Sequence, residues 1–297
     1  MNLSSPPARA DWMSVFVHGR TARRYAPLTS LLLVLPLLAS FAVGFIYPVA
    51  MLVRLSFSRG LEPYLRLLQE TLYLDVLLTT VVTAGIVASL CLLLGYPVAY
   101  AMAKLSRTAA LVTAACVFVP LWTSVLIRSY AWIVLLQRNG IVNELLQGVG
   151  ITHEPLKLLY TQGAVVLAMT HVLLPFAILP IHSTLRMLSP DLHRAAANLG
   201  AGPLRTFVSV TLPLSLPGVF AAAILCFVLA LGFYITPALV GGPGSMLMAT
   251  LIGQQTTVVL DWPFAAALSC VLLTITLLLV LVFRRVFTFS KGFTNVH

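Results

Sequence analysis

The chain has 297 residues, of which 60% are hydrophobic and 9% are charged, and its formal net charge is +10. A soluble domain carries about 25% charged residues, so this composition excludes a soluble enzyme, a DNA-binding protein and a disordered chain. The basic side chains are scattered singly rather than gathered into a stripe, so we expect no nucleic-acid partner. The lipid bilayer is the expected solvent for most of the chain.

Long uncharged stretches predict where the chain crosses the bilayer. A spanning helix needs about 20 apolar residues, and five uncharged stretches have 22 or more residues. The longest holds one span followed by a glycine-rich turn, and a sixth span contains Pro120 and Arg128. We expect an all-α integral membrane protein with six transmembrane helices. Three lie at about 26–53, 111–136 and 214–240, and the others lie within the uncharged stretches 76–103, 158–185 and 262–283.

The distribution of arginine predicts the orientation. Six spans place both termini on one side, where twelve basic and two acidic residues gather; the opposite loops hold five basic and six acidic residues. Cytoplasmic loops carry an excess of Lys and Arg, so both termini are expected in the cytoplasm. Residues 1–25 are polar and lack the apolar core of a signal peptide, so we expect a cytoplasmic tail there. A second tail is expected at 287–297, and residues 26–71 are expected to hold the first span and an outer segment.

The sequence offers no catalytic or metal-binding motif. Its four cysteines fall within expected spans without disulfide or metal-ligand spacing, so we interpret them as small apolar packing residues. An intramembrane hydrolase would need a nucleophile and a base on facing helices, but neither Gly-x-Ser-x-Gly nor His-Glu-x-x-His occurs. We interpret His171 in the fourth span as a packed or hydrogen-bonded histidine.

The longest cytoplasmic loop, residues 187–213, predicts a short helix with a defined start and end. Ser189 is placed to cap it, Pro190 occupies the first helical position, and Asp191 complements the helix dipole. Gly200 is expected to end it in a left-handed conformation. A second short helix is expected at 204–212.

Pro213 is expected to end that second helix before the fifth span. A mere connection needs far fewer residues than this loop contains. We therefore expect the loop to form a docking surface with little side-chain bulk.

The loop resembles the EAA loop of ABC importer permeases, and we call residues 187–213 the EAA-like segment. The family pattern is Glu-Ala-Ala, three residues, Gly, and about nine further residues to a hydrophobic residue, Leu and Pro. Arg194 stands where the Glu usually is. The residues in register are Ala195, Ala196, Gly200, Leu212 and Pro213.

The resemblance implies that this segment couples the chain to a separate ATPase. Small residues would let the short helix sit close in a groove of the ATPase. Arg194 has two open interpretations, namely a pair with Asp191 across one helical turn or a contact with an acid on the ATPase. The residues assigned to coupling are Asp191, Arg194, Ala195, Ala196, Gly200, Leu212 and Pro213.

Four further stretches resemble the spermidine/putrescine branch of these permeases, at 120–124, 126–132, 232–237 and 261–264. The resemblance implies a type I ABC importer permease fold with its core at 72–286, in the bacterial inner membrane. The implied substrate is spermidine, putrescine or a similar small amine. Another small organic solute remains an alternative.

The energy for pumping must come from another chain. The phosphate-binding pattern Gly-x-x-x-x-Gly-Lys-Ser/Thr is absent, since the lysines are Lys104, Lys157 and Lys291. We therefore expect a non-catalytic subunit that binds no cofactor. The resemblance implies a second, non-identical permease subunit, two ATP-binding subunits that carry ATP and Mg²⁺, and a periplasmic substrate-binding protein.

A channel and a secondary transporter are the competing classes. A proton-coupled transporter is expected to carry acids within its spans, but Asp75 and Asp261 fall at the outer ends. Composition alone does not exclude a channel. The EAA-like segment separates the classes, because neither a channel nor an enzyme needs it.

Candidate pathway residues gather in the outer halves of the third, fifth and sixth spans. Arg128 could face a cavity or lie near the interface with its charge in water. The aromatic residues could line a pathway or form an interfacial belt, and Trp122 and Tyr234, beside Pro120 and Pro237, suit a cavity better than the others. The predicted pathway residues are Trp122, Thr123, Arg128, Tyr130, Phe233, Tyr234, Asp261 and Trp262.

Overall fold

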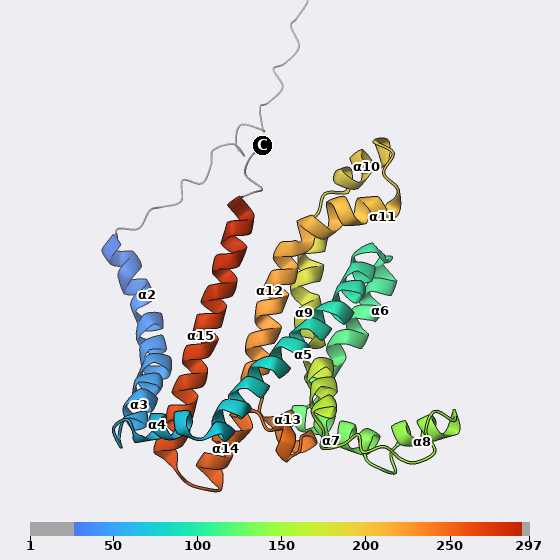
Figure 1. Cartoon of the computed structure of the whole chain (residues 1–297). Coiled ribbons are helices and arrows are strands. Elements are labelled where there is room, and N and C mark those ends of the chain that lie inside the picture. The colour runs from blue at the N-terminus through green and yellow to red at the C-terminus, as the bar shows by residue number, and fades with distance from the viewer. Residues whose placement is uncertain (1–26, 293–297) are drawn as a thin grey trace, which may run out of the picture. The chain divides into compact units, whose positions relative to one another are not determined.

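The computed structural model describes residues 27–292, and every regular element within them is a helix (Figure 1). The chain divides into two compact units, residues 1–51 and 52–297. In chain order the elements are α2 (Pro27–Phe41), η1 (Ala42–Ile46), α3 (Tyr47–Ser56), α4 (Glu62–Gln69), α5 (Thr71–Lys104), α6 (Arg107–Phe118), η2 (Val119–Trp122), α7 (Val125–Leu136), α8 (Ile141–Gly148), α9 (Gln162–Arg186), α10 (Pro190–Asn198), α11 (Pro203–Thr206), η3 (Phe207–Thr211), α12 (Leu212–Leu231), α13 (Ile235–Val240), η4 (Pro243–Ser245), α14 (Met248–Thr257) and α15 (Trp262–Gly292).

The described part of the first unit is a helix with one π turn. α2, the π-helix η1 and α3 follow one another without a break, and residues 34–56 are long and apolar enough to cross a membrane. The predicted first span is confirmed where it is described. The predicted tail at 1–25 lies outside the described residues. At the other terminus, α15 continues to Gly292, so the described part of the predicted tail 287–297 is helical.

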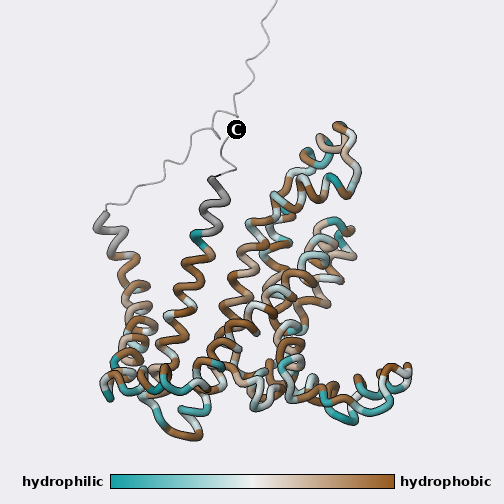
Figure 2. The backbone as a smooth tube through the Cα atoms, viewed as in Figure 1, coloured by the Kyte–Doolittle hydropathy of each residue, from teal (hydrophilic) through white to brown (hydrophobic). Residues whose placement is uncertain are grey.

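Across the residues that the structure describes, five helices can span a membrane. Besides residues 34–56 these are α5, α9, the helix Pro203–Leu231, and residues 262–285 of α15. The helices Arg107–Trp122 and Val125–Gly148 meet at a bend of 100°. If this bent pair is one broken span, it adds a sixth crossing. The span predicted at about 111–136 falls within this bent pair. Figure 2 shows apolar residues along the long helices and hydrophilic residues mainly at their ends.

Local sequence explains the break in the third span. Pro120 lies in a 3-10 turn, η2, because proline lacks the N–H and has a ring that disrupts an α-helix. Thr123 is extended, and Ser124 caps α7 by accepting a hydrogen bond from the Leu126 amide at 3.3 Å. Trp122 and Thr123 thus lie at a break between two helices rather than inside one.

The fifth span differs from its prediction at both ends. α11, the π-helix η3 and α12 are continuous from Pro203 to Leu231, so the prediction that Pro213 ends a separate short helix is wrong. In the π turn the Leu212 amide bonds to the carbonyl of Phe207, five residues back. This wider turn directly precedes Pro213 and accommodates a ring that would disrupt a regular α-helix. Residues 235–240 form the separate helix α13.

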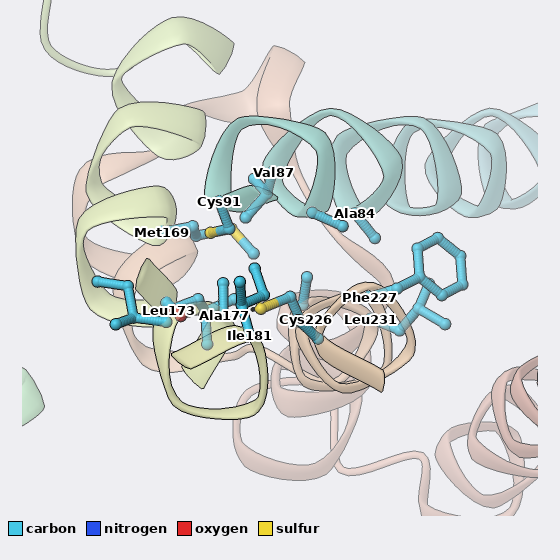
Figure 3. Packing of buried hydrophobic residues seen from close by; sticks show 14 of the residues in the cluster. Ala84, Val87, Cys91, Met169, Leu173, Ala177, Ile181, Cys226, Phe227 and Leu231 are labelled. Carbon is cyan, nitrogen blue, oxygen red and sulfur yellow. Dashed lines mark hydrogen bonds between the residues drawn. The ribbon is translucent and has the colours of Figure 1, made fainter. Parts of the chain in front are cut away.

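The core of the second unit lies where α5, α9 and α12 pack against one another. Figure 3 shows Cys91, Met169, Leu173 and Cys226 close together at this junction. Small residues let the helices approach, as is typical of membrane proteins. A Cβ at Gly95 of α5 would lie 3.3 Å from the Ala177 Cβ of α9. These three helices form the packed core of the second unit.

Candidate functional site

The first helix of the EAA-like segment has the caps that were predicted. The Ser189 hydroxyl accepts a hydrogen bond from the Asp191 amide at 3.2 Å, and α10 begins at the next residue after Ser189. At the other end Gly200 has φ +77°. The Gly200 amide bonds to the Ala197 carbonyl at 2.9 Å and the Ala201 amide to the Ala196 carbonyl at 3.0 Å. These two bonds form a Schellman motif, which turns the chain sharply out of α10.

The surface of this segment is apolar and open. Ala195 is exposed, and so is Leu199, whose side chain is 87% accessible. Three more large apolar side chains, Met187, Leu192 and Leu204, are also exposed. Figure 1 shows α10 beyond the end of α9 and beside α11. Because α10 lies past the end of α9, its apolar side chains are suited to contact another protein.

Arg194 pairs with Asp191 inside the same helix. The Arg194 Nη1 and Asp191 Oδ1 atoms are 3.1 Å apart, and the two side chains are 78% and 80% exposed. An exposed ion pair of this kind contributes between about 0 and 1 kcal/mol. Arg194 thus has an acidic partner within its own helix. The predicted role of these two residues in coupling stays a prediction.

The base of the segment is fixed to the core. His193 Nε2 and Thr211 Oγ1 are 3.1 Å apart and join α10 to the π-helix η3. Phe207 of η3 meets Tyr96 and Tyr100 of α5 edge to face, with ring centroids 5.9 and 5.4 Å apart. These contacts connect α10 through η3 to α5. Of the remaining assigned residues, Leu212 is half-buried and Pro213 is exposed.

The first group of predicted pathway residues lies at the break after α6. The Trp122 side chain is 89% exposed, the most exposed among the large apolar residues that the structure describes. The Thr123 hydroxyl donates to the Pro120 carbonyl at 2.7 Å and helps to end the 3-10 turn. Tyr130, one turn into α7, is also exposed.

Arg128 lies after the break, in the first turn of α7. Its side chain is 9% exposed, and no side-chain acceptor within the described chain bonds to its Nε. The next residue, Ser129, lies 2.9 Å from Thr236 of α13, measured between the hydroxyl oxygens. α7 and α13 are therefore joined directly beside this cation.

Phe233 and Tyr234 form the break between α12 and α13. Phe233 packs against the core cluster, whereas Tyr234 is 45% exposed. The Tyr234 ring lies against Gly253 of α14, where a Cβ would come within 2.5 Å of ring carbon Cε2. A glycine at this point of α14 makes room for the ring.

Asp261 takes part in an ionic cluster that the sequence did not reveal. Its carboxylate oxygens lie 3.0 Å from Arg59 Nη1 and 3.6 Å from Arg66 Nη1. Arg66 also pairs with Glu70 at 3.1 Å. Burial lowers the pKa of Arg66, but the hydrogen bond to Glu70 raises it, and its net pKa lies above the ordinary value. The cluster fastens α4 to the start of α15, where Trp262 is exposed.

The predicted pathway residues do not form one contact cluster. In the part of the chain that the structure describes, no hydrogen bond, ion pair or ring contact joins any two of them. Their assignment to the pathway stays a prediction. Sequence reasoning missed Arg59 and Arg66, because they lie about 200 residues from Asp261 and no spacing pattern connects them.

A search of residues 27–292 for metal-ligating side chains finds no cluster. No group of three or more His, Cys, Asp or Glu residues there could hold a metal ion. The Trp132 indole N–H donates to His171 Nδ1 at 3.3 Å, so the prediction that His171 is hydrogen-bonded is confirmed.

Comparison with known proteins agrees with this geometry. The model of the family described as binding-protein-dependent transport system inner membrane component matches residues 12–287. The chain is 36% identical over 225 residues to the spermidine/putrescine transport system permease protein PotB of Escherichia coli (strain K12), covering 76% of this chain and 82% of that protein. It is 35% identical over 230 residues to PotB of Haemophilus influenzae, covering 77% and 80%.

A solved structure shares the fold. It is a bacterial ABC transporter involved in the import of the acidic polysaccharide alginate, and one of its chains matches with a TM-score of 0.71 and 19% identity. The match covers 87% of this chain and 96% of the other. At this identity the likeness concerns the fold.

The helical fold and the EAA-like segment define the permease component of a type I ABC importer, a multi-pass protein of the bacterial inner membrane. The chain belongs to the family of binding-protein-dependent transport system inner membrane components.

Proposed function

We propose that this chain forms half of the transmembrane pathway of an ATP-driven importer of spermidine, putrescine or a similar small amine. The observation that carries the proposal is the likeness to PotB over 225 residues, which includes the EAA-like segment. An importer of another small organic solute is the alternative. It is distinguished by competition with unlabelled solutes in an uptake measurement.

The partners follow from what the chain lacks and what it exposes. It has no phosphate-binding loop for ATP, so two separate ATP-binding subunits, carrying ATP and Mg²⁺, are proposed to dock on the EAA-like segment. A second, non-identical permease is proposed to complete the pathway. A periplasmic binding protein is proposed to deliver the substrate, and this chain is proposed to be non-catalytic.

Exposed aromatic faces suit the passage of an amine. Trp122, Tyr130, Tyr234 and Trp262 each expose a large part of their side chain. An ammonium group over such a face gains about 0.5–2 kcal/mol from the cation–π interaction. These residues can therefore replace part of the water that a charged amine loses on entering the pathway.

Acidic groups at the outer mouth divide into two kinds. Asp261 is neutralised by Arg59 and Arg66, so it is poorly suited to attract a cation. Asp75 is exposed, and no ion pair to it occurs among the described residues. We therefore propose that Asp75, or an acid of the second permease, provides the negative charge near the entrance.

Uptake by single variants tests the pathway. Trp122→Ala and Tyr234→Ala are expected to raise the KM for spermidine about 2- to 30-fold, the equivalent of one lost cation–π contact. Complex assembly and basal ATP hydrolysis should not change. Tyr47→Ala, which removes an exposed aromatic residue of the first span, is the control and should leave KM unaltered. An unchanged KM in both pathway variants would assign these aromatics to packing alone.

A further inference from the structure

A cavity of about 250 Å³ opens at the base of the EAA-like segment. It lies between the last turns of α5 and α9, the start of α10, and η3. Its lining residues are Tyr100, Ala103, Lys104, Leu185, Arg186, Leu188, Pro190, His193 and Thr211. It is separate from the exposed tip at Leu199 and from the predicted substrate pathway.

Two cations and a histidine line this cavity. Lys104, Arg186 and His193 come from three different helices, and no acidic residue lines the cavity. Within the described residues neither Lys104 nor Arg186 has an ion pair, and Asp191 of α10 pairs with Arg194. Lys104 Nζ lies 5.9 Å from the centroid of the Tyr100 ring. The cavity therefore holds unbalanced positive charge.

A favourable helix dipole explains only part of this arrangement. Lys104 and Arg186 lie in the last turns of α5 and α9, where a cation is stabilised by about 0.3–1 kcal/mol. That interaction requires no common cavity, and it does not account for His193, which lies on α10. Convergence of two cations and an imidazole on one hollow, with no acid among its lining residues, indicates an anionic ligand.

The position of the cavity at the ends of two spanning helices indicates where the anion comes from. Lys104 and Arg186 are the last residues of two membrane-spanning helices, on the side that the arginine distribution assigns to the cytoplasm. The cytoplasmic leaflet carries anionic lipids, and basic pockets between spanning helices on that side bind lipid head groups. The apolar walls at Ala103, Leu185 and Leu188 are compatible with the glycerol backbone and the first acyl carbons.

We propose that this cavity binds the phosphate group of an anionic phospholipid. Water occupies roughly 30 Å³ per molecule, so the cavity has the room of about eight waters and holds a head group while the acyl chains stay in the bilayer. The bound phosphate bridges α5 and α9 to α10. It thereby holds the base of the EAA-like segment in one position, and we expect ATPase activity to depend on anionic lipid.

Lipid binding tests the proposal on the assembled transporter. The complex is placed in nanodiscs of phosphatidylcholine, alone or mixed with phosphatidylglycerol, and retained lipid is counted by native mass spectrometry. Lys104→Gln with Arg186→Gln should weaken phosphatidylglycerol binding about 30-fold, which corresponds to about 1 kcal/mol for each cation removed. Arg107→Gln with Arg285→Gln removes the same charge from exposed positions outside the cavity and should bind lipid like the unaltered chain.

Three results would overturn the proposal. Equal phosphatidylglycerol binding by both double variants would show that the cavity holds no lipid. Stimulation of ATPase activity by inorganic phosphate in phosphatidylcholine discs would assign the site to a free anion. Loss of the ATPase subunits from the cavity variant, with lipid binding intact, would assign it to a protein contact. Since lipid retention needs no substrate, failure here leaves the proposed transport function to be judged separately.

Discussion

Gly200 shows how one residue sets the geometry of the EAA-like segment. Its φ of +77° lies in the left-handed region, which costs other residues about 1–2 kcal/mol. No atom of the chain lies within 4 Å of the position that a Cβ would occupy. The space beside Gly200 is therefore open. The small size of glycine is not needed for packing within the chain, and we expect it to be needed for contact with a partner.

A large side chain at this position should uncouple the transporter. Gly200→Leu is expected to lower uptake per ATP hydrolysed by about tenfold or more, because the added bulk holds α10 away from the ATPase groove. Gly150→Leu is the matched control, since Gly150 also has φ +77° and open space. It lies on the side predicted to face outward. Equal loss of coupling in both variants would attribute the effect to backbone strain.

Arg194 should be nearly silent when it is shortened. Because it pairs with Asp191 at 3.1 Å, Arg194→Ala is expected to change ATPase association less than about twofold at any salt concentration. Arg194→Glu places two acids side by side and should be mildly harmful. The measurement is ATPase subunit binding across a salt series. Salt-dependent weakening by both variants would instead show that Arg194 contacts the ATPase.

Single residues were predictable wherever the cause was local. The Ser189 cap and the Gly200 stop depend on neighbours within a few positions, so their residue types were enough to place α10. Asp261 was different. Its partner Arg59 is 202 residues away, and nothing in either local sequence indicates that the fold brings the two together.

At the scale of elements, proline had opposite effects at two places. Pro120 accompanies a 3-10 turn and a bend of 100°, because Ser124 offers a cap that starts a new helix. Pro213 lies in an unbroken helix, because the π turn before it absorbs the distortion. The sequence predicted that Pro213 ends a helix, and at that site the prediction is wrong. Proline marks an irregularity, but the groups around it decide whether the helix ends.

Close packing between α9 and α12 depends on Gly218. A Cβ there would lie 2.7 Å from the Pro180 carbonyl oxygen, and it would also meet the Thr184 side chain. Gly218→Ala is therefore expected to lower the free energy of unfolding by about 1–3 kcal/mol. Thermal denaturation of the purified complex measures this change.

Gly85→Ala provides the control for this substitution. Gly85 is also inside a spanning helix, α5, but a Cβ there meets no atom within 4 Å. The change should be neutral or stabilising by up to about 1 kcal/mol, as for Gly to Ala in a helix. Equal destabilisation by both substitutions would contradict the assigned contact between α12 and α9.

At the scale of the whole molecule, composition predicted the fold class and most of the spans. Low charge and long apolar stretches are enough to identify helices that cross a bilayer. They could not predict how the spans pack, because helix contacts in membranes depend on small residues and shape rather than on hydropathy. The close packing of α5, α9 and α12 thus emerged from the structure. The predicted pathway residues do not contact one another in this chain. The other half of the pathway is proposed to belong to a second permease.

ATP-dependent uptake in proteoliposomes tests the central claim most directly. The chain is reconstituted with its second permease and ATPase subunits, and labelled spermidine is supplied with the binding protein. We predict uptake that requires ATP hydrolysis, stops when this chain is omitted, and is blocked by unlabelled putrescine. Uptake that proceeds down a gradient without ATP, or uptake by this chain alone, would contradict the account and indicate a channel or a secondary transporter.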